Sequence, residues 1–272
     1  MTRQFKVWRF FNIYSSFGLL EIQRVFQYNA WFWVELGRGI IAMIIMTAFW
    51  KAIYGDQTLI AGLSLTTTLN YVILARALNN ANASSVYWWI ASHISKGELE
   101  LQLLRPLDFQ LLHLFRDAMS WSIGLLRSLP ALLIGVIIFS AQLPTNFMAY
   151  IAFLITFVLG GIVMFFFEFM LGCIAFYTTE VWGLSVLQGG IALFFSGAYI
   201  PLNFLPMTFQ TIASLTPFAQ ALYVPISFLS GVRDPSSLGQ AILLQLISML
   251  ILAGLSRWIF SKAVRVLTVQ GG

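Results

Sequence analysis

Long apolar blocks separated by short polar connectors dominate the pattern of this chain. A membrane-spanning helix needs about 20 apolar residues, and six blocks reach that length, at residues 33–54, 60–81, 112–141, 147–170, 182–202 and 238–260. Prolines stand at or just beyond several block ends, where helix breakers belong. The pattern predicts an all-α integral membrane fold with six transmembrane helices.

The first 32 residues have a different pattern. Apolar side chains recur at helical spacing on one face, whereas Arg9, Glu21 and Arg24 lie within the same stretch. These charges disfavour a membrane span and favour an amphipathic helix in the headgroup region. We therefore divide the chain into an interfacial helix at 1–32 and one membrane domain at 33–272, with a first transmembrane helix as the alternative for the N-terminal stretch.

Composition supports the membrane assignment. The chain is 59% hydrophobic and only 9% charged, whereas a soluble domain carries roughly 25% charged residues. The net charge of +5 would also suit a nucleic-acid-binding protein. However, the basic residues stand at the edges of apolar blocks rather than along one face, so we expect no nucleic-acid partner.

The basic residues also predict the orientation of the chain. With the N-terminus inside, the cytoplasmic side receives nine of them, namely Arg3, Lys6, Arg9, Arg24, Lys96, Arg105, Arg257, Lys262 and Arg265. The opposite side receives only Lys51 and Arg233. Short cytoplasmic loops are enriched in Lys and Arg, so both termini are predicted to be cytoplasmic. The polar connector at 84–108 then lies in the cytoplasm, either as a plain loop or as a contact surface for a partner.

Motifs for catalysis are absent from the sequence. None of the lysines follows the glycine spacing of a Walker A loop, so we do not expect this chain to hydrolyse ATP. His93 and His113 lack metal-ligand spacing, and Cys173 is the single cysteine. We expect a chain that is not an enzyme and has neither a metal site nor a cofactor of its own.

Two charged residues inside the apolar blocks have no assigned role. Glu168 is the one serious candidate for a proton relay, and Arg127 is the deepest basic residue. An intramembrane charge suggests function, but a helix that bends at Pro130 and begins further from the membrane would explain Arg127. For Glu35 and Arg38 we expect an ordinary i,i+3 ion pair.

Four stretches resemble the signatures of ABC-2 type exporter permeases, the transmembrane subunits of bacterial ABC transporters. They are ISKGELELQLLRPLDF at 94–109, FYTTEVWGL at 176–184, FFSGAYIPLNFLP at 194–206 and TPFAQALYVPISFLSG at 216–231. The resemblance covers nearly the whole chain. It implies a bacterial inner-membrane location, a cytoplasmic coupling helix, and outer re-entrant helices between the fifth and sixth spans.

The resemblance also implies partners. Two ABC ATP-binding subunits would bind ATP and Mg, and a second permease chain, identical or a paralogue, would complete the pathway within the membrane lipid. Coupling to the ATPase would involve the helix and turn formed by His93, Ile94, Ser95, Lys96, Gly97 and Glu98, with Glu180 on the same surface. Gly97 suits a sharp turn because glycine tolerates positive φ.

The translocation pathway is expected at the permease–permease interface, along the first, second and fifth spans. Its candidate residues are Thr67, Asn70, Tyr71, Phe194, Phe195 and Tyr199. Aromatic faces would suit an amphiphile or a hydrophobic cation. The same polar residues could instead serve as interhelical hydrogen-bonding groups, and the aromatic residues as packing or interfacial anchors.

The function that follows is outward movement of an amphipathic, drug-like or lipid-like solute, as in multidrug efflux, powered by separate ATP-binding chains. Two alternatives stay open at this point: a proton-driven secondary exporter, and a membrane anchor without transport activity.

Overall fold

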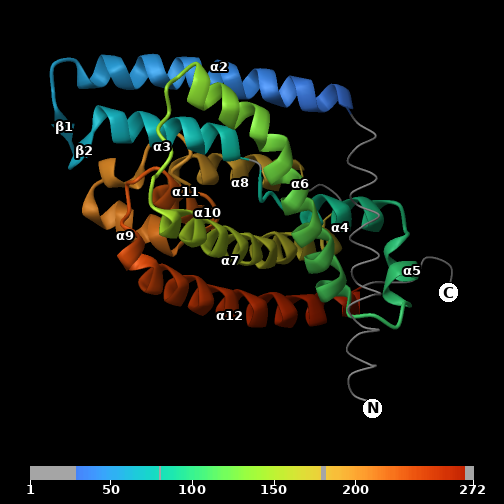
Figure 1. The fold of residues 1–272 in the computed structure, drawn as a ribbon. Helices are drawn as coiled ribbons and strands as arrows, with labels where there is room; N and C mark the ends of the chain where they lie inside the picture. Colours follow the sequence, from blue (N-terminus) through green and yellow to red (C-terminus); the bar gives the residue numbers. More distant parts are fainter. Residues whose placement is uncertain (1–28, 80, 179–181, 267–272) are drawn as a thin grey trace, which may run out of the picture.

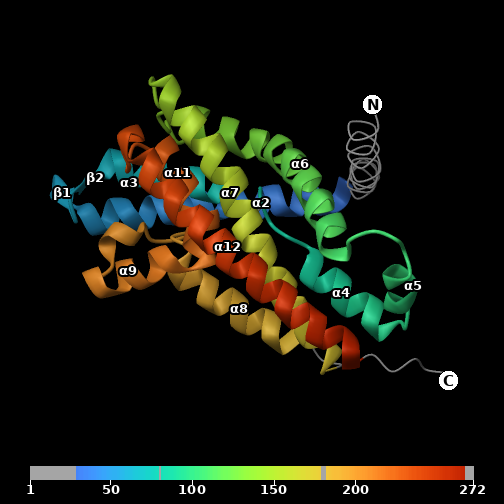
Figure 2. The same ribbon diagram turned by 90° about the horizontal axis from the view of Figure 1, so that it is seen from below.

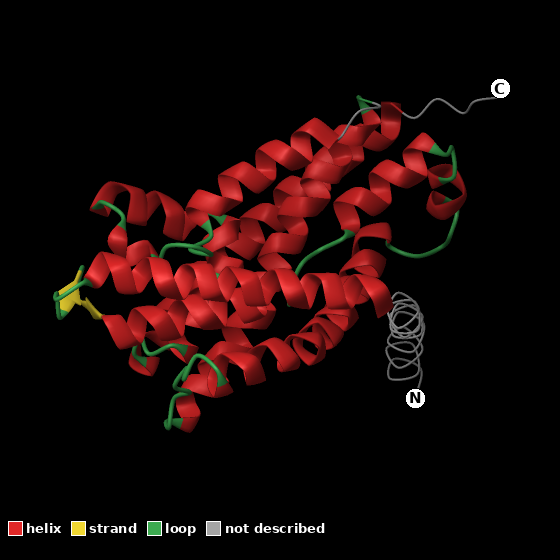
Figure 3. Cartoon of the chain, turned by 90° about the horizontal axis from the view of Figure 1, so that it is seen from above, coloured by secondary structure: helices red, strands yellow, loops and turns green. Residues whose placement is uncertain are grey.

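The structure, a computed structural model, describes residues 29–79, 81–178 and 182–266 of the 272-residue chain. Its elements are almost entirely helical (Figures 1 and 3). The helices are α2 (Asn29–Tyr54), α3 (Leu65–Leu78), α4 (Val86–Ser95), α5 (Leu99–Leu103), α6 (Phe109–Ile137), α7 (Phe147–Gly172), α8 (Trp182–Phe195), α9 (Met207–Leu215), α10 (Pro217–Ala221), α11 (Tyr223–Leu229) and α12 (Leu238–Ala263). One antiparallel hairpin, β1 (Leu59–Ile60) and β2 (Leu63–Ser64), joins α2 to α3. The prediction of an all-α fold is confirmed, whereas the predicted amphipathic helix at 1–32 lies largely outside the described residues.

Four helices are long and apolar enough to cross a membrane. They correspond to Phe32–Tyr54, Phe109–Ile137, Phe147–Phe176 and Pro235–Val266, within the described part of the chain. Each overlaps one of the predicted apolar blocks, so those four predictions are confirmed as long apolar helices. The third block begins earlier than predicted because Asp108 caps α6, its Oδ1 accepting a hydrogen bond from the Leu111 backbone amide at 2.9 Å.

The other two predicted spans are short helices here. α3 and α8 each have 14 residues, about 21 Å at 1.5 Å per residue, against a hydrocarbon core of about 30 Å. Ser64 caps the start of α3, where its Oγ accepts a hydrogen bond from the Thr67 amide at 3.2 Å. Gly197, with φ of +73°, follows the end of α8. The count of six continuous spans is therefore not reproduced in the described residues.

The proline-rich loop after α8 folds into short helices. Met207–Leu215 and Pro217–Leu229 form a pair that bends by 73° at Thr216, and together they are apolar enough to count as a fifth, broken span. Thr216 caps the second member, since its Oγ1 accepts from the Ala219 amide. In Figure 1, α9 lies at the same end of the bundle as the β-hairpin and the start of α12. Prolines thus accompany the division of this loop into short helices, while its identification as re-entrant stays a prediction.

α7 is the central helix of the bundle. It packs against α12, α10, α11 and α4 (Figure 2), and its Phe165 and Phe169 are fully buried. A side-chain amide joins three of these elements: Gln245 Nε2 donates to the carbonyl oxygens of Thr156 and Gln220, each at 2.9 Å. Because buried polar groups need partners, this bridge fixes α12 and α10 against α7.

Candidate functional site

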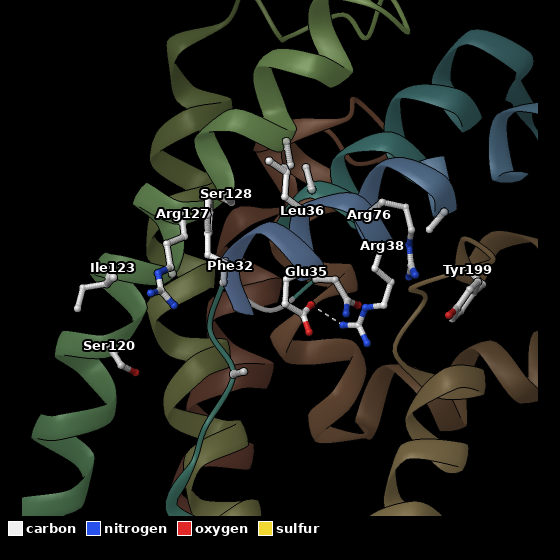
Figure 4. Close-up of a pocket in the computed structure, with 18 of the residues that line it drawn as sticks. Phe32, Glu35, Leu36, Arg38, Arg76, Ser120, Ile123, Arg127, Ser128 and Tyr199 are labelled. Carbon is white, nitrogen blue, oxygen red and sulfur yellow. Dashed lines mark hydrogen bonds and ion pairs between the residues drawn. The ribbon is translucent and has the colours of Figure 1, made fainter. Parts of the chain in front are cut away.

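A cavity of about 510 Å³ lies between α2, the end of α3, α6 and the residues around the end of α8 (Figure 4). Most of its wall consists of small or apolar side chains, including Leu36, Ala42, Ala77, Ile123 and Leu193. Cavities of this size hold small molecules in many proteins. Its size and its mixture of apolar and charged lining make it a candidate for a ligand site.

The charged side chains of this cavity are mostly positive. Arg38, Arg76 and Arg127 line it together with one carboxylate, Glu35, which leaves a formal surplus of two positive charges. Arg38 Nη2 donates to Glu35 Oε2 at 2.6 Å, which confirms the expected i,i+3 ion pair. Arg127, which the sequence placed deepest in the membrane, also lines the cavity. Its guanidinium lies 5.9 Å from the centroid of the Phe32 ring.

Arg76 has two uncharged partners. Its Nη2 donates to the carbonyl oxygen of Ala198 at 2.5 Å, and its guanidinium stacks 4.1 Å from the centroid of the Tyr199 ring. Its Nε is buried without a hydrogen-bond partner among the described residues. These contacts fix the guanidinium in place but leave its charge unneutralised.

The predicted coupling connector forms α4, a tight turn and α5. Gly97 has φ of +67°, a value that residues with a side chain rarely adopt. The predicted positive φ at this turn is therefore confirmed. Ser95, Lys96, Gly97 and Glu98 are all exposed. The turn is closed by a hydrogen bond from the Glu98 amide to the His93 carbonyl at 2.9 Å. The exposed turn therefore presents both charges and backbone at the tip of α4.

The preceding residues of α4 are attached to the bundle by stacked rings. Trp89 stacks on His93 with ring centroids 3.6 Å apart and lies 4.2 Å from His113 of α6. Phe109 lies 4.6 Å from His113 and stacks on Phe260 of α12 at 5.3 Å. The chain of rings therefore runs from the coupling segment through the start of α6 to the end of α12.

A second attachment joins α4 to the central helix. Ile90 and Tyr87 are buried and pack against α7 at Gly172, where an added Cβ would lie 2.9 Å from Ile90 Cδ1. Ser84, just before α4, donates to the carboxylate of Asp117 on α6. α4 is thus held by α6 and α7, while residues 95–98 at its tip are exposed. The sequence identified the turn at the tip of α4 but not the contacts that hold α4 to the bundle. The run of aromatic residues at 87–89 was the one sequence signal for these contacts.

The second-span residues of the predicted pathway have structural partners. Thr67 takes part in the cap of α3, and Asn70 Oδ1 accepts from the Gln142 amide at 2.9 Å. Tyr71 is fully buried, and its hydroxyl donates to the Gly197 carbonyl at 2.8 Å. Asn70 and Tyr71 thus bond to loop backbone and Thr67 to the cap of its own helix, so these are structural hydrogen bonds but not interhelical ones. None of the three residues lines the cavity.

The predicted aromatic residues near the end of α8 differ from one another. Phe194 is 76% exposed, Phe195 packs against the hydrophobic core, and Tyr199 lines the cavity. Glu168 is buried in α7 and accepts a hydrogen bond from Gln188 of α8. Glu180 lies outside the described residues. The structure thus brings Tyr199, but not Phe195, to the candidate ligand site.

No group of three His, Cys, Asp or Glu residues in the described ranges is arranged to hold a metal ion. No curated protein and no solved structure matches the chain. One family model matches, that of the ABC-2 family transporter proteins, over residues 40–271. That match covers the connector and most of the chain, and it includes the cavity residues from Ala42 onward but not those at 32–39 of α2. The protein therefore belongs to the ABC-2 family of transporter proteins.

Proposed function

We propose that this chain is the membrane-spanning permease subunit of an ABC exporter, and that it moves an amphipathic solute outward. The observation that carries the proposal is the connector: a short helix with an exposed, charged tip that is attached at its base to α6 and α7. A plain loop would not need such attachments, whereas a lever that transmits force does.

The energy for transport comes from separate chains. The sequence has no Walker A loop in which backbone amides and a lysine could bind phosphates. Members of this family work with ATP-binding subunits, so two such subunits and a second permease chain complete the assembly we propose. ATP and Mg then bind on the partners, and this chain contributes no catalytic group.

The distribution of charge supports a cytoplasmic position for the connector. At the end of the bundle that carries α4, α5 and the end of α12 lie Lys96, Arg105, Arg257, Lys262 and Arg265 (Figure 1). The opposite end carries Lys51 and Arg233. Since basic residues are retained on the cytoplasmic side, the connector faces the cytoplasm, where ATP-binding chains are found.

The ring contacts supply a route for the movement. When the ATP-binding chains close, they displace the tip at residues 95–98, and the displacement reaches α6 and α12 through Trp89, His113 and Phe109. Packed cores switch between discrete arrangements rather than deforming smoothly. The membrane helices therefore shift as a body between inward-open and outward-open states.

A matched pair of variants tests this assignment. Gly97→Val with Glu98→Lys alters the exposed turn, and Gly55→Val with Asp56→Lys makes the same changes at an exposed positive-φ turn at the opposite end. In the complex reconstituted in vesicles, the first pair should abolish substrate-stimulated ATP hydrolysis and the second should leave it unchanged. Equal stimulation in both pairs would overturn the coupling assignment.

A further inference from the structure

We propose that the arginine-lined cavity binds the anionic headgroup of an amphiphile, a phosphate or carboxylate whose apolar tail lies against α2 and α8. This inference rests on the proposed function, because it names the class of solute that the permease would take. It replaces the hydrophobic cation considered from the sequence with a ligand of opposite charge.

The unneutralised charge of Arg76 is the first step. The Arg76 side chain is partly buried, and a guanidinium that gives up part of its hydration is stabilised when an anion pairs with it. Its partners here, the Ala198 carbonyl and the Tyr199 ring, are both neutral. Figure 4 shows the Arg76 and Arg38 side chains extending toward the same part of the cavity. A bound anion would supply the missing charge.

The type of cation is the second step. A guanidinium presents planar pairs of N–H donors that match the oxygens of phosphate and carboxylate, and such bonds are the strong ones among hydrogen bonds. Arg38 comes from α2, Arg76 from α3 and Arg127 from α6. Donors from α2 and α3 can therefore bind one headgroup, whereas Arg127 lines the cavity on the other side of Phe32 (Figure 4). The site would change whenever these helices move relative to one another.

The apolar surroundings are the third step. Leu36, Ile123 and Leu193 line the cavity among the arginines. Beside it, Trp33 is 65% exposed on α2 and Phe194 is 76% exposed on α8. A free inorganic anion would make no contact with these apolar surfaces, whereas the apolar tail of an amphiphile can pack against them.

A cationic ligand is disfavoured by the same contacts. Aromatic faces attract cations, but the face of Tyr199 is already covered by the guanidinium of Arg76 at 4.1 Å. A second cation there would meet repulsion from Arg76 and Arg38. The aromatic residue that suggested a cation site in the sequence therefore serves to hold an arginine.

Binding can be tested on the purified complex without ATP hydrolysis. Titration calorimetry compares dihexanoyl phosphatidic acid with dihexanoyl phosphatidylcholine, which has the same chains. The acidic lipid should bind at least about tenfold more tightly, because each charge-assisted hydrogen bond contributes about that factor. Arg76→Gln and Arg38→Gln should each remove most of this preference and leave binding of the zwitterionic lipid unchanged.

Arg233→Gln is the matched control. Arg233 also lies over aromatic rings, 5.9 Å from Tyr223 and 5.7 Å from Phe228, but it does not line the cavity. Arg38 is 66% exposed, so its variant tests the site even if Arg76→Gln fails to fold. Equal affinity for the two lipids, or full preference in both cavity variants, would overturn the site. Inorganic phosphate binding as tightly as the acidic lipid would overturn the amphiphile assignment.

The outcome can be separated from that of the proposed function. The Gly97→Val, Glu98→Lys variant should bind phosphatidic acid normally while losing ATPase stimulation. If the unmodified complex shows no preference for phosphatidic acid but its ATPase stimulation still depends on the turn at residues 97–98, only the cavity proposal is refuted. Normal lipid binding in a protein that has no ATP-binding companion would instead refute the transport assignment.

Discussion

Gly160 of α7 makes the closest approach to the α10 backbone. A Cβ at this position would lie 2.3 Å from the carbonyl oxygen of Gln220 and 2.9 Å from the Cα of Ala221. Both are backbone atoms, so neither can rotate away. Replacement by alanine must move α10 away from α7, and the Gln245 amide that donates to Gln220 must follow.

The magnitude of this effect follows from three contributions. Alanine in a helix gains about 1 kcal/mol over glycine. Overpacking of a close helix contact costs about 2 kcal/mol, and weakening one buried hydrogen bond of Gln245 costs about 1 kcal/mol more. The net loss for Gly160→Ala is therefore about 2 kcal/mol. Gly254→Ala on the exposed side of α12, where nothing lies within 4 Å, should lose nothing.

Thermal unfolding of the purified protein in detergent, followed by tryptophan fluorescence, measures the difference. A loss of about 2 kcal/mol corresponds to a lower midpoint by about 6 °C in a domain of this size. Gly254→Ala should unfold at or slightly above the midpoint of the unmodified protein. If Gly160→Ala is as stable as Gly254→Ala, then α10 does not pack on α7 as described.

Three further predictions follow from the described contacts. Trp89→Ala should lower substrate-stimulated ATPase activity about tenfold or more while basal hydrolysis continues, measured in vesicles, because the ring contact to His113 at 4.2 Å is lost. Glu168→Gln should leave transport intact, measured as solute accumulation in inverted vesicles with ATP, because an amide replaces the carboxylate that bonds to Gln188; loss of transport would instead favour a proton-driven exporter. Asp108→Asn should lower the free energy of unfolding by less than about 1 kcal/mol at neutral pH, since the ion pair of Asp108 with Arg257 is partly solvent-screened. Thermal unfolding of both proteins between pH 7 and pH 3 measures this difference.

The pH dependence of that last prediction has a definite sign. Hydrogen bonding from Arg257 holds the pKa of Asp108 below its usual value. A carboxyl group with a lowered folded-state pKa contributes stability above its unfolded value of about 4 and loses it as the pH falls through the folded-state value. The difference between Asp108→Asn and the unmodified protein should therefore shrink below about pH 4. A gap that does not shrink at all as the pH falls below about 4 would show that the ion pair is not its cause.

The four long apolar helices could be predicted from sequence because burial in lipid requires nothing more than length and apolar composition. The 60–81 block failed as a single helix because Ser64 begins α3 and the polar stretch after Leu78 ends it. A hydropathy average over about 20 residues does not resolve either the start or the end of this short helix. The break at Thr216 was predictable because proline removes a backbone donor and clashes with the preceding turn.

The candidate site was only partly predictable. Gly97 could be assigned from its turn, because the need for positive φ is local. The cavity could not, because Arg38, Arg76 and Arg127 lie on three helices and line one cavity only after packing. Tyr199 was predicted as a pathway residue, but the arginine that covers its ring lies far from it in the chain. The family resemblance therefore pointed to the turn after α4, and only tertiary structure identified the cavity.

The central claim is that force enters through the exposed turn after α4. A photo-crosslinking amino acid at Lys96, introduced in the native assembly, tests it most directly. Irradiation should join this chain covalently to an ATP-hydrolysing chain, and the same residue at Lys51 should give no such product. If the Lys96 position gives no product with a nucleotide-hydrolysing chain while the complex still transports, the account is contradicted.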